Sequence, residues 1–205
     1  MVSKTVASTK EKIMRSAARL FSEKGFGNVS TREIAKTLGL NSASLYYYFA
    51  SKDELLKSLY DSYRMWLRET NPNLPELMRM AETHPPHEVL AKAVFVFDDD
   101  NMEMMEQIIV TAAREIYADS ESEAFIRETV FENVAGILRP LLSHMIALDK
   151  IEPMNLDEFL RMLSYYCFSA AALSNSSLQP TPDDYFNGML YHISMIKAKE
   201  VATDR

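Results

Sequence analysis

Apolar positions along this chain recur with the three-to-four-residue spacing of helices rather than with the alternation of strands. The clearest case lies near the start, where one helical face carries Ile13, Ala17, Leu20 and Phe21. Gly25 follows as a residue that readily takes the positive φ found where helices end. The pattern predicts a helix over residues 9–24.

Two short helices joined by a glycine turn are predicted next. Ser30 and Glu33 form an S-x-x-E capping box, so a helix is expected to begin at Thr31. It must end before Gly39, after which Asn41 can cap a second short helix. Such a pair, preceded by a supporting helix, has the organisation of a helix-turn-helix DNA reader.

Helix signals continue through the rest of the chain and strand-like runs are scarce, so the predicted fold class is all-α. Further caps mark helix starts at Ser51 with Glu54, Ser120 with Glu123, and Asn155 with Glu158. Helices are expected over residues 52–69, 75–82, 87–98, 101–118, 121–148, 155–177 and 182–199.

Composition excludes several protein classes. One cysteine and five glycines rule out disulfide frameworks and collagen, and no apolar run approaches the roughly 18 residues of a membrane span. The first ten residues lack the apolar stretch of a signal peptide, so a cytoplasmic location is expected. Motifs for nucleotide binding or hydrolysis are missing from the sequence, and His84 and His87 have no third ligand nearby. No catalytic residue, metal or cofactor is expected.

Charge is distributed unevenly along the chain. Residues 1–68 carry twelve Lys and Arg against six Asp and Glu, a net charge of +6. The whole chain has a net charge of −7, so residues 69–205 carry −13. A basic end joined to an acidic body fits a nucleic-acid-binding head, although a solvated charge bias explains the same numbers.

The second short helix has a distinctive outward side. At 100° per residue, Leu45 and Phe49 share a core-facing side, while Ala43 and Tyr47 lie opposite. Three consecutive tyrosines at 46–48 spread over about 200°, so at least one must face outward. An outward tyrosine can donate to a phosphate or lay its ring on a thymine methyl; the alternative is packing against a neighbouring lobe.

This segment resembles the N-terminal domain of TetR-family transcriptional regulators. The resemblance rests on residues 30–35, on the turn at 38–41 and on the run LYYYFASKDELL at 45–56, and it extends over residues 13–59. It implies a helix-turn-helix DNA-binding domain over residues 1–55. It also implies a helical effector-binding and dimerisation domain over residues 56–205.

The same resemblance implies which side chains contact DNA: Thr31, Arg32, Ser42, Ala43, Ser44, Tyr46, Tyr47, Tyr48 and Lys52. Among these, Tyr48 and Lys52 match phosphate contacts; a solvated lysine is the alternative for Lys52. The sequence departs from the family at Ser42, where Lys or Arg is frequent, and at Ala43, where Gly is frequent. Guanine reading is therefore expected mainly from Arg32.

The helix predicted over residues 155–177 is amphipathic at its start and apolar all round from Tyr165 onward, so it needs cover on two sides. A second copy of the chain would supply that cover in a four-helix homodimer interface; a central helix in a monomeric bundle is the alternative. The dimer residues expected are Tyr165, Phe168, Ala172, Met189, Ile193 and Ile196.

Thirteen methionines and many aromatics could line an apolar cavity, although most must simply be core. From helix position in the family, the effector pocket is expected to include Trp66, Met105, Phe131 and Tyr166. The effector is expected to be an apolar or amphipathic small molecule.

Together these observations predict a homodimeric repressor that binds double-stranded operator DNA and is released by a small-molecule effector, with no membrane association. Two other classes stay open at this point. An all-helical enzyme would need a convergent polar constellation, and a DNA-free interaction protein would leave the outward side chains dispensable.

Overall fold

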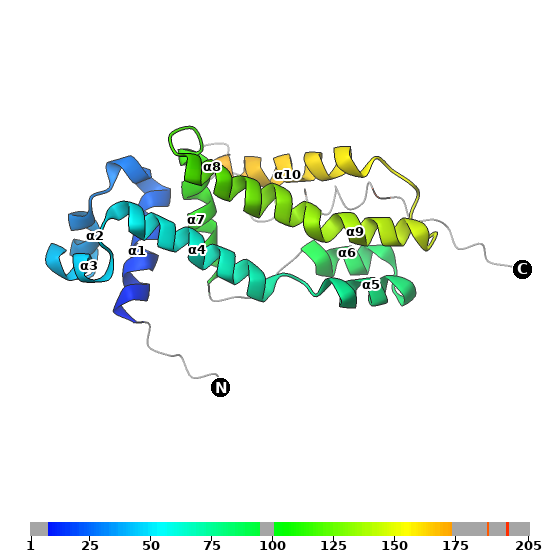
Figure 1. The fold of residues 1–205 in the computed structure, drawn as a ribbon, viewed down its shortest axis with the longest axis horizontal. Helices are drawn as coiled ribbons and strands as arrows, with labels where there is room; N and C mark the ends of the chain where they lie inside the picture. The colour runs from blue at the N-terminus through cyan, green and yellow to red at the C-terminus, as the bar shows by residue number, and fades with distance from the viewer. Residues whose placement is uncertain (1–7, 95–100, 174–187, 189–195, 197–205) are drawn as a thin grey trace, which may run out of the picture. The chain divides into compact units, whose positions relative to one another are not determined.

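The computed structural model describes residues 8–94, 101–173, 188 and 196. The elements of this described part are all helical, which confirms the predicted fold class. Figure 1 labels them. They are α1 (Thr9–Lys24), η1 (Phe26–Asn28), α2 (Thr31–Thr37), α3 (Ser42–Tyr48), α4 (Lys52–Thr70), α5 (Leu74–Thr83), α6 (Pro86–Val94), α7 (Met102–Glu115), α8 (Ser120–Ile126), the π-helix η2 (Arg127–Glu132), α9 (Asn133–Ala147) and α10 (Leu156–Leu173). Within the described part, none of these helices has both the length and the apolarity to cross a bilayer.

The chain divides into two compact units. Unit 1 comprises residues 1–69 and 100–125, and unit 2 comprises residues 70–99 and 126–205. Unit 1 therefore contains α4 and α7 in addition to the three helices of the predicted DNA-binding head. The functional division at residue 55 stays a prediction, since compactness does not test it.

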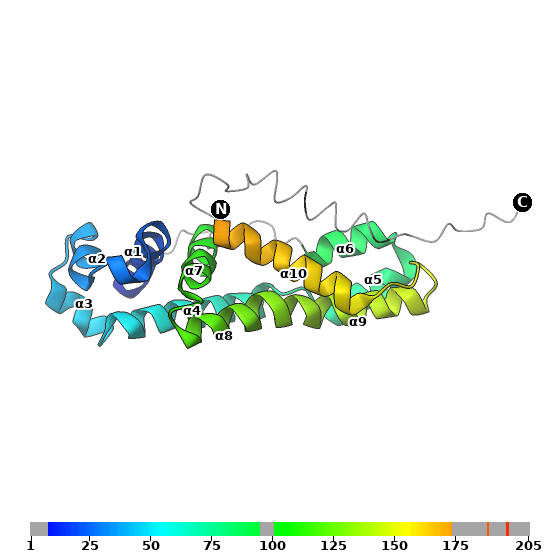
Figure 2. The same cartoon turned by 90° about the horizontal axis from the view of Figure 1, so that it is seen from above.

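Unit 1 is built around α1. The side chain of Ser8 caps this helix by accepting from the Glu11 amide at 3.2 Å. The four apolar residues of the predicted face, Ile13, Ala17, Leu20 and Phe21, are all buried, so this prediction is confirmed. On one side α1 contacts α2, and on another it lies along α7, as both views show (Figures 1 and 2).

Polar bonds join α1 to α7 at both ends of their contact. In the first half of α1, Arg15 donates at 2.6 Å to the side chain of Asn101, the residue that precedes α7. Near the end of α1, Arg114 of α7 donates to the Ser22 carbonyl at 2.6 Å, and Glu115 accepts from the Phe26 amide at 3.1 Å. These partners are some 86 to 92 residues apart, so no local pattern could have predicted them.

A buried polar contact ties α4 to α8 within unit 1. The hydroxyls of Tyr60 and Ser122 lie 2.8 Å apart, and the Tyr60 ring stacks on Phe125 at 4.3 Å between centroids. Burial raises the pKa of Tyr60, so its phenol stays protonated. The cap of α8 is Asp119, which accepts from the Ser122 amide at 2.8 Å. The predicted Ser120–Glu123 capping box is wrong because Asp119 occupies that role.

Unit 2 has its own apolar core. It is formed mainly by α5, α6, α9 and α10, and its most buried members are Leu77, Ala81, Val89, Leu141, Leu142, Met145 and Ile151. At the start of α10, Asn155 accepts from the Glu158 amide at 3.2 Å, which confirms this predicted cap. The helix expected over 121–148 is not regular, because the π-helix at Arg127–Glu132 interrupts it. The expected helix over 182–199 lies almost wholly outside the described residues.

Candidate nucleic-acid interface

The predicted pair of short helices is present in unit 1. Ser30 caps α2 by accepting from the Glu33 amide at 3.1 Å, and Asn41 caps α3 by accepting from the Ser44 amide at 2.7 Å. Gly39 lies between them with φ of 66°, a left-handed backbone conformation that residues with a Cβ rarely adopt. The local caps and the turn residue therefore position α3 as the sequence predicted.

The inner side of α3 is firmly anchored. Leu45 and Phe49 are 0% and 1% exposed, as the helical wheel predicted, and Ile34 and Ala35 of α2 are buried as well. An anchored inner side fixes which residues can point outward, since rotating a seven-residue helix would expose this core.

The tyrosine cluster confirms the prediction that at least one ring faces outward. Tyr47 is 84% exposed and Tyr46 is 52% exposed, whereas Tyr48 is half-buried and meets the Tyr47 ring edge-on at 5.1 Å. The Tyr46 hydroxyl lies 3.2 Å from the Thr31 hydroxyl, so it is already engaged with the start of α2. Tyr47 is the most prominent outward side chain of α3.

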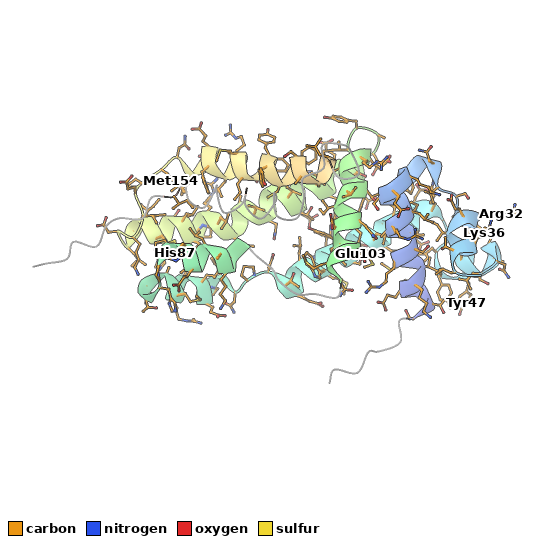
Figure 3. The ribbon with its side chains drawn as sticks, turned by 180° about the vertical axis from the view of Figure 1, so that it is seen from behind. Arg32, Lys36, Tyr47, His87, Glu103 and Met154 are labelled. Carbon is orange, nitrogen blue, oxygen red and sulfur yellow. The ribbon has the colours of Figure 1, made fainter. Side chains whose placement is uncertain are left out.

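Two exposed cations, Arg32 and Lys36, lie on α2, the helix that precedes α3. Figure 3 shows Arg32 and Lys36 projecting from the α2–α3 part of unit 1, on the side that also carries Tyr47. Both side chains are exposed. The neighbouring Glu33 is held by Lys24 at 2.5 Å, and that hydrogen bond lowers the pKa of Glu33. The charge of Glu33 is thus paired with Lys24. Within the described part of the chain, Arg32 makes no side-chain hydrogen bond or ion pair.

Lys52 has an internal role that the sequence did not suggest. Its Nζ donates to the Phe26 carbonyl at 2.8 Å and to the Val29 carbonyl at 3.0 Å, and it lies 4.2 Å from the centre of the Phe26 ring. These bonds fasten the start of α4 to the turn before α2. The ammonium has three protons, so one is left over, and the predicted phosphate contact stays a prediction.

A shallow open depression lies between the starts of α2 and α4. Its lining comes from residues 27–31, Tyr46 and residues 50–52. Three predicted DNA-contacting residues, Thr31, Tyr46 and Lys52, therefore meet here. Of the other six members of that set, Arg32 lies on α2, and Ser42, Ala43, Ser44, Tyr47 and Tyr48 lie on α3.

The predicted effector residues fall in separate units. Trp66 and Met105 belong to unit 1, where Trp66 lies 5.4 Å from the Tyr63 ring and Met105 is buried. Phe131 and Tyr166 belong to unit 2, where the Phe131 ring meets Tyr165 edge-on at 5.4 Å. A pocket that unites these four residues stays a prediction.

The predicted dimer residues differ in exposure within the chain. Tyr165 is 58% exposed, Ala172 is exposed, and Phe168 is half-buried on α10. Ile196 is only 7% exposed and is part of the unit 2 core. Met189 and Ile193 lie outside the described residues. The interface itself stays a prediction.

Comparison with known proteins identifies the relatives of the N-terminal part. Residues 13–59 match the model of the bacterial regulatory proteins of the tetR family. A Bacillus subtilis protein named probable HTH-type transcriptional regulator YttP is 42% identical over 71 residues, which cover 33% of this chain and 34% of YttP. The HTH-type transcriptional repressor KstR2 of Mycobacterium tuberculosis is 37% identical over 62 residues, 30% of this chain and 31% of KstR2. The chain thus spans about a third of the length of these curated relatives.

Solved structures extend the likeness to the whole fold. The KstR2 structure aligns with a TM-score of 0.56 at 19% identity, covering 98% of this chain and all of KstR2. Escherichia coli NemR in its reduced form aligns with a TM-score of 0.62 at 17% identity, covering 95% of this chain and all of NemR. At these identities the likeness describes the fold.

Proposed function

We propose, from the premise that this chain belongs to the TetR family, that it is a transcriptional regulator that binds operator DNA through α2 and α3. The observation that carries the proposal is Tyr47, an aromatic side chain that is 84% exposed on a helix whose opposite side is sealed by Leu45 and Phe49. Leaving such a ring in water has no packing benefit, whereas DNA offers it phosphate, sugar and base partners.

The basic head supports the same proposal. Lys10, Lys12, Arg32 and Lys36 are exposed on α1 and α2, and they supply the positive charge that sequence-independent phosphate contacts require. KstR2, which is named a transcriptional repressor, shares sequence with this head, so we propose repression rather than activation.

A homodimer completes the proposal. On α10 the side chains of Met162, Tyr165 and Leu173 are exposed in the single chain, and a second copy would cover them. Two recognition helices held roughly 34 Å apart would enter successive major grooves. Light scattering on the chain and on Tyr165→Glu tests this step: the chain should have the mass of two copies and the variant that of one. A monomeric chain would contradict it.

A small-molecule effector, apolar or amphipathic, would release the DNA. Contacts between α7 and α1 support a route for this signal, because Arg114 and Glu115 bond directly to the end of α1 and to η1. Near-complete switching requires about 5.5 kcal/mol of differential affinity for the two states. A compound found by thermal shift should lower DNA affinity, and one that binds without doing so would refute this step.

The binding proposal is tested by selection from a pool of randomised duplexes. The selected duplex should bind more tightly than a scrambled one, and Tyr47→Ala should lose that preference while keeping the salt dependence. Tyr117→Ala serves as a matched control, because Tyr117 is 99% exposed on the turn after α7. Equal affinity for selected and scrambled DNA would reject sequence-specific binding.

A further inference from the structure

The outermost surface of α3 is a methyl group beside an aromatic ring. Ala43 and Tyr47 are four residues apart, so they are neighbours on one side of the helix, and both are exposed. The side opposite them holds Leu45 and Phe49 in the core. Any base edge that meets the middle of α3 therefore meets these two side chains first.

Two polar side chains of α3, Ser44 and Tyr46, already have hydrogen-bond partners within the protein. Ser44 donates its hydroxyl to the Asn41 side chain at 3.0 Å, and the same oxygen accepts from the Ser44 amide. The Tyr46 hydroxyl lies within hydrogen-bond distance of Thr31. Ser42 is half-buried. These bonds keep Asn41, Ser44 and Tyr46 occupied within the protein.

The helix also lacks the side chains that read purines. Its sequence, SASLYYY, contains no Arg, Lys, Asn or Gln. Bidentate recognition of guanine in the major groove requires Arg or Lys, and that of adenine requires Asn or Gln. One base feature in that groove is apolar, the C5 methyl of thymine, which alanine and aromatic side chains contact.

We infer that α3 reads thymine methyl groups, with Ala43 and Tyr47 as the residues that determine specificity. The inference rests on the proposed function and deepens it, because it names the base chemistry that the operator must present. The operator has thymines at the base pairs beneath the middle of α3. Any guanine dependence comes from Arg32, whose guanidinium is exposed on α2.

The test uses the duplex selected by the full chain, in which each thymine is replaced in turn by deoxyuridine. This change removes one methyl group and leaves base pairing intact. At the contacted positions affinity should fall about fourfold for each methyl lost. Tyr47→Phe should behave like the wild type, because the ring and not the hydroxyl makes the contact.

A double-mutant comparison assigns the contact to its residue. In Tyr47→Ala the deoxyuridine penalty at one thymine should disappear, while in Tyr117→Ala it should persist. Tyr47 is exposed, so thermal unfolding of Tyr47→Ala should match that of the wild type, and lost binding cannot then be assigned to misfolding.

Three results would overturn the inference while leaving sequence-specific binding intact. The first is a selected duplex in which no thymine is sensitive to deoxyuridine. The second is an undiminished penalty in Tyr47→Ala, and the third is an equal loss in Tyr47→Phe and Tyr47→Ala. A chain that selects no sequence at all overturns the proposed function and this inference together.

Discussion

Replacing Lys52 with methionine should destabilise unit 1 by about 2 kcal/mol. Methionine keeps most of the length and apolar packing of the lysine stem but removes the ammonium. That ammonium makes two charge-assisted bonds to backbone carbonyls, of Phe26 and Val29, and contacts the Phe26 ring. Fully buried, two such bonds would contribute about 3 kcal/mol or more. Lys52 is half-buried, so water replaces part of the loss.

The assay is urea unfolding followed by tryptophan fluorescence. Trp66 is the one tryptophan of the chain and lies on α4, so its signal reports on unit 1. The matched control is Lys57→Met on the same helix, where the lysine is exposed and the change should stay within about 0.5 kcal/mol.

Equal unfolding midpoints for Lys52→Met and Lys57→Met would refute this reasoning. The internal bonds would then contribute nothing measurable. A DNA titration tests separately whether Lys52 also contacts a phosphate. If it does, Lys52→Met should lower the slope of log affinity against log salt concentration by about one.

Three further predictions concern the positive φ of Gly39, the helix cap Asp119 and the close approach of Gly188 to Tyr166. Gly39→Ala should cost about 1 kcal/mol of unfolding free energy, because its φ of 66° strains any residue with a Cβ. Hydrogen bonding from Ser122 lowers the pKa of Asp119 below its ordinary 3.8, so this carboxylate stabilises the fold above about pH 4 and the contribution is lost as pH falls through the lowered pKa. The stability difference between wild type and Asp119→Asn should therefore be largest near pH 7 and should close in acid. A Cβ at position 188 would overlap the Tyr166 ring, so Gly188→Ala should destabilise unit 2 by about 1–3 kcal/mol in thermal unfolding.

Each of these has a control or an opposing outcome. Gly27→Ala matches Gly39→Ala, because Gly27 is also open to solvent but lacks a positive φ; equal costs would remove the strain argument. A wild-type to Asp119→Asn difference that is constant from pH 7 to pH 3 would show that the charge of Asp119 is irrelevant. Full stability of Gly188→Ala would show that Tyr166 does not need the space beside residue 188.

Local signals in the sequence were enough to predict the two short helices α2 and α3 and the turn between them. Ser30 and Asn41 cap the starts of α2 and α3, and Gly39 makes the turn between the two helices; each acts on residues within three or four positions. The spacing of Leu45 and Phe49 then determined which side of α3 is buried. Short-range rules work here because the caps, the turn and the core positions all agree.

Contacts between distant segments could not be read in the same way. The bond from Arg114 to the Ser22 carbonyl joins residues 92 positions apart and ends on a backbone atom, which carries no sequence signal. Lys52 likewise bonds to two backbone carbonyls. Because backbone atoms are the same in every residue, nothing in the sequence indicated that these bonds form. The π-helix at Arg127–Glu132 lies within a run of ordinary helical periodicity, and the apolar pattern alone did not reveal it.

The central claim is that the outward side of α3 contacts DNA, and hydroxyl-radical labelling of the protein measures this directly. Tyr47 and Tyr117 are both highly exposed in the free chain, at 84% and 99%, so both should be oxidised readily. With the selected duplex bound, oxidation of Tyr47 should fall sharply and that of Tyr117 should stay unchanged. Undiminished labelling of Tyr47 in the saturated complex would contradict the account.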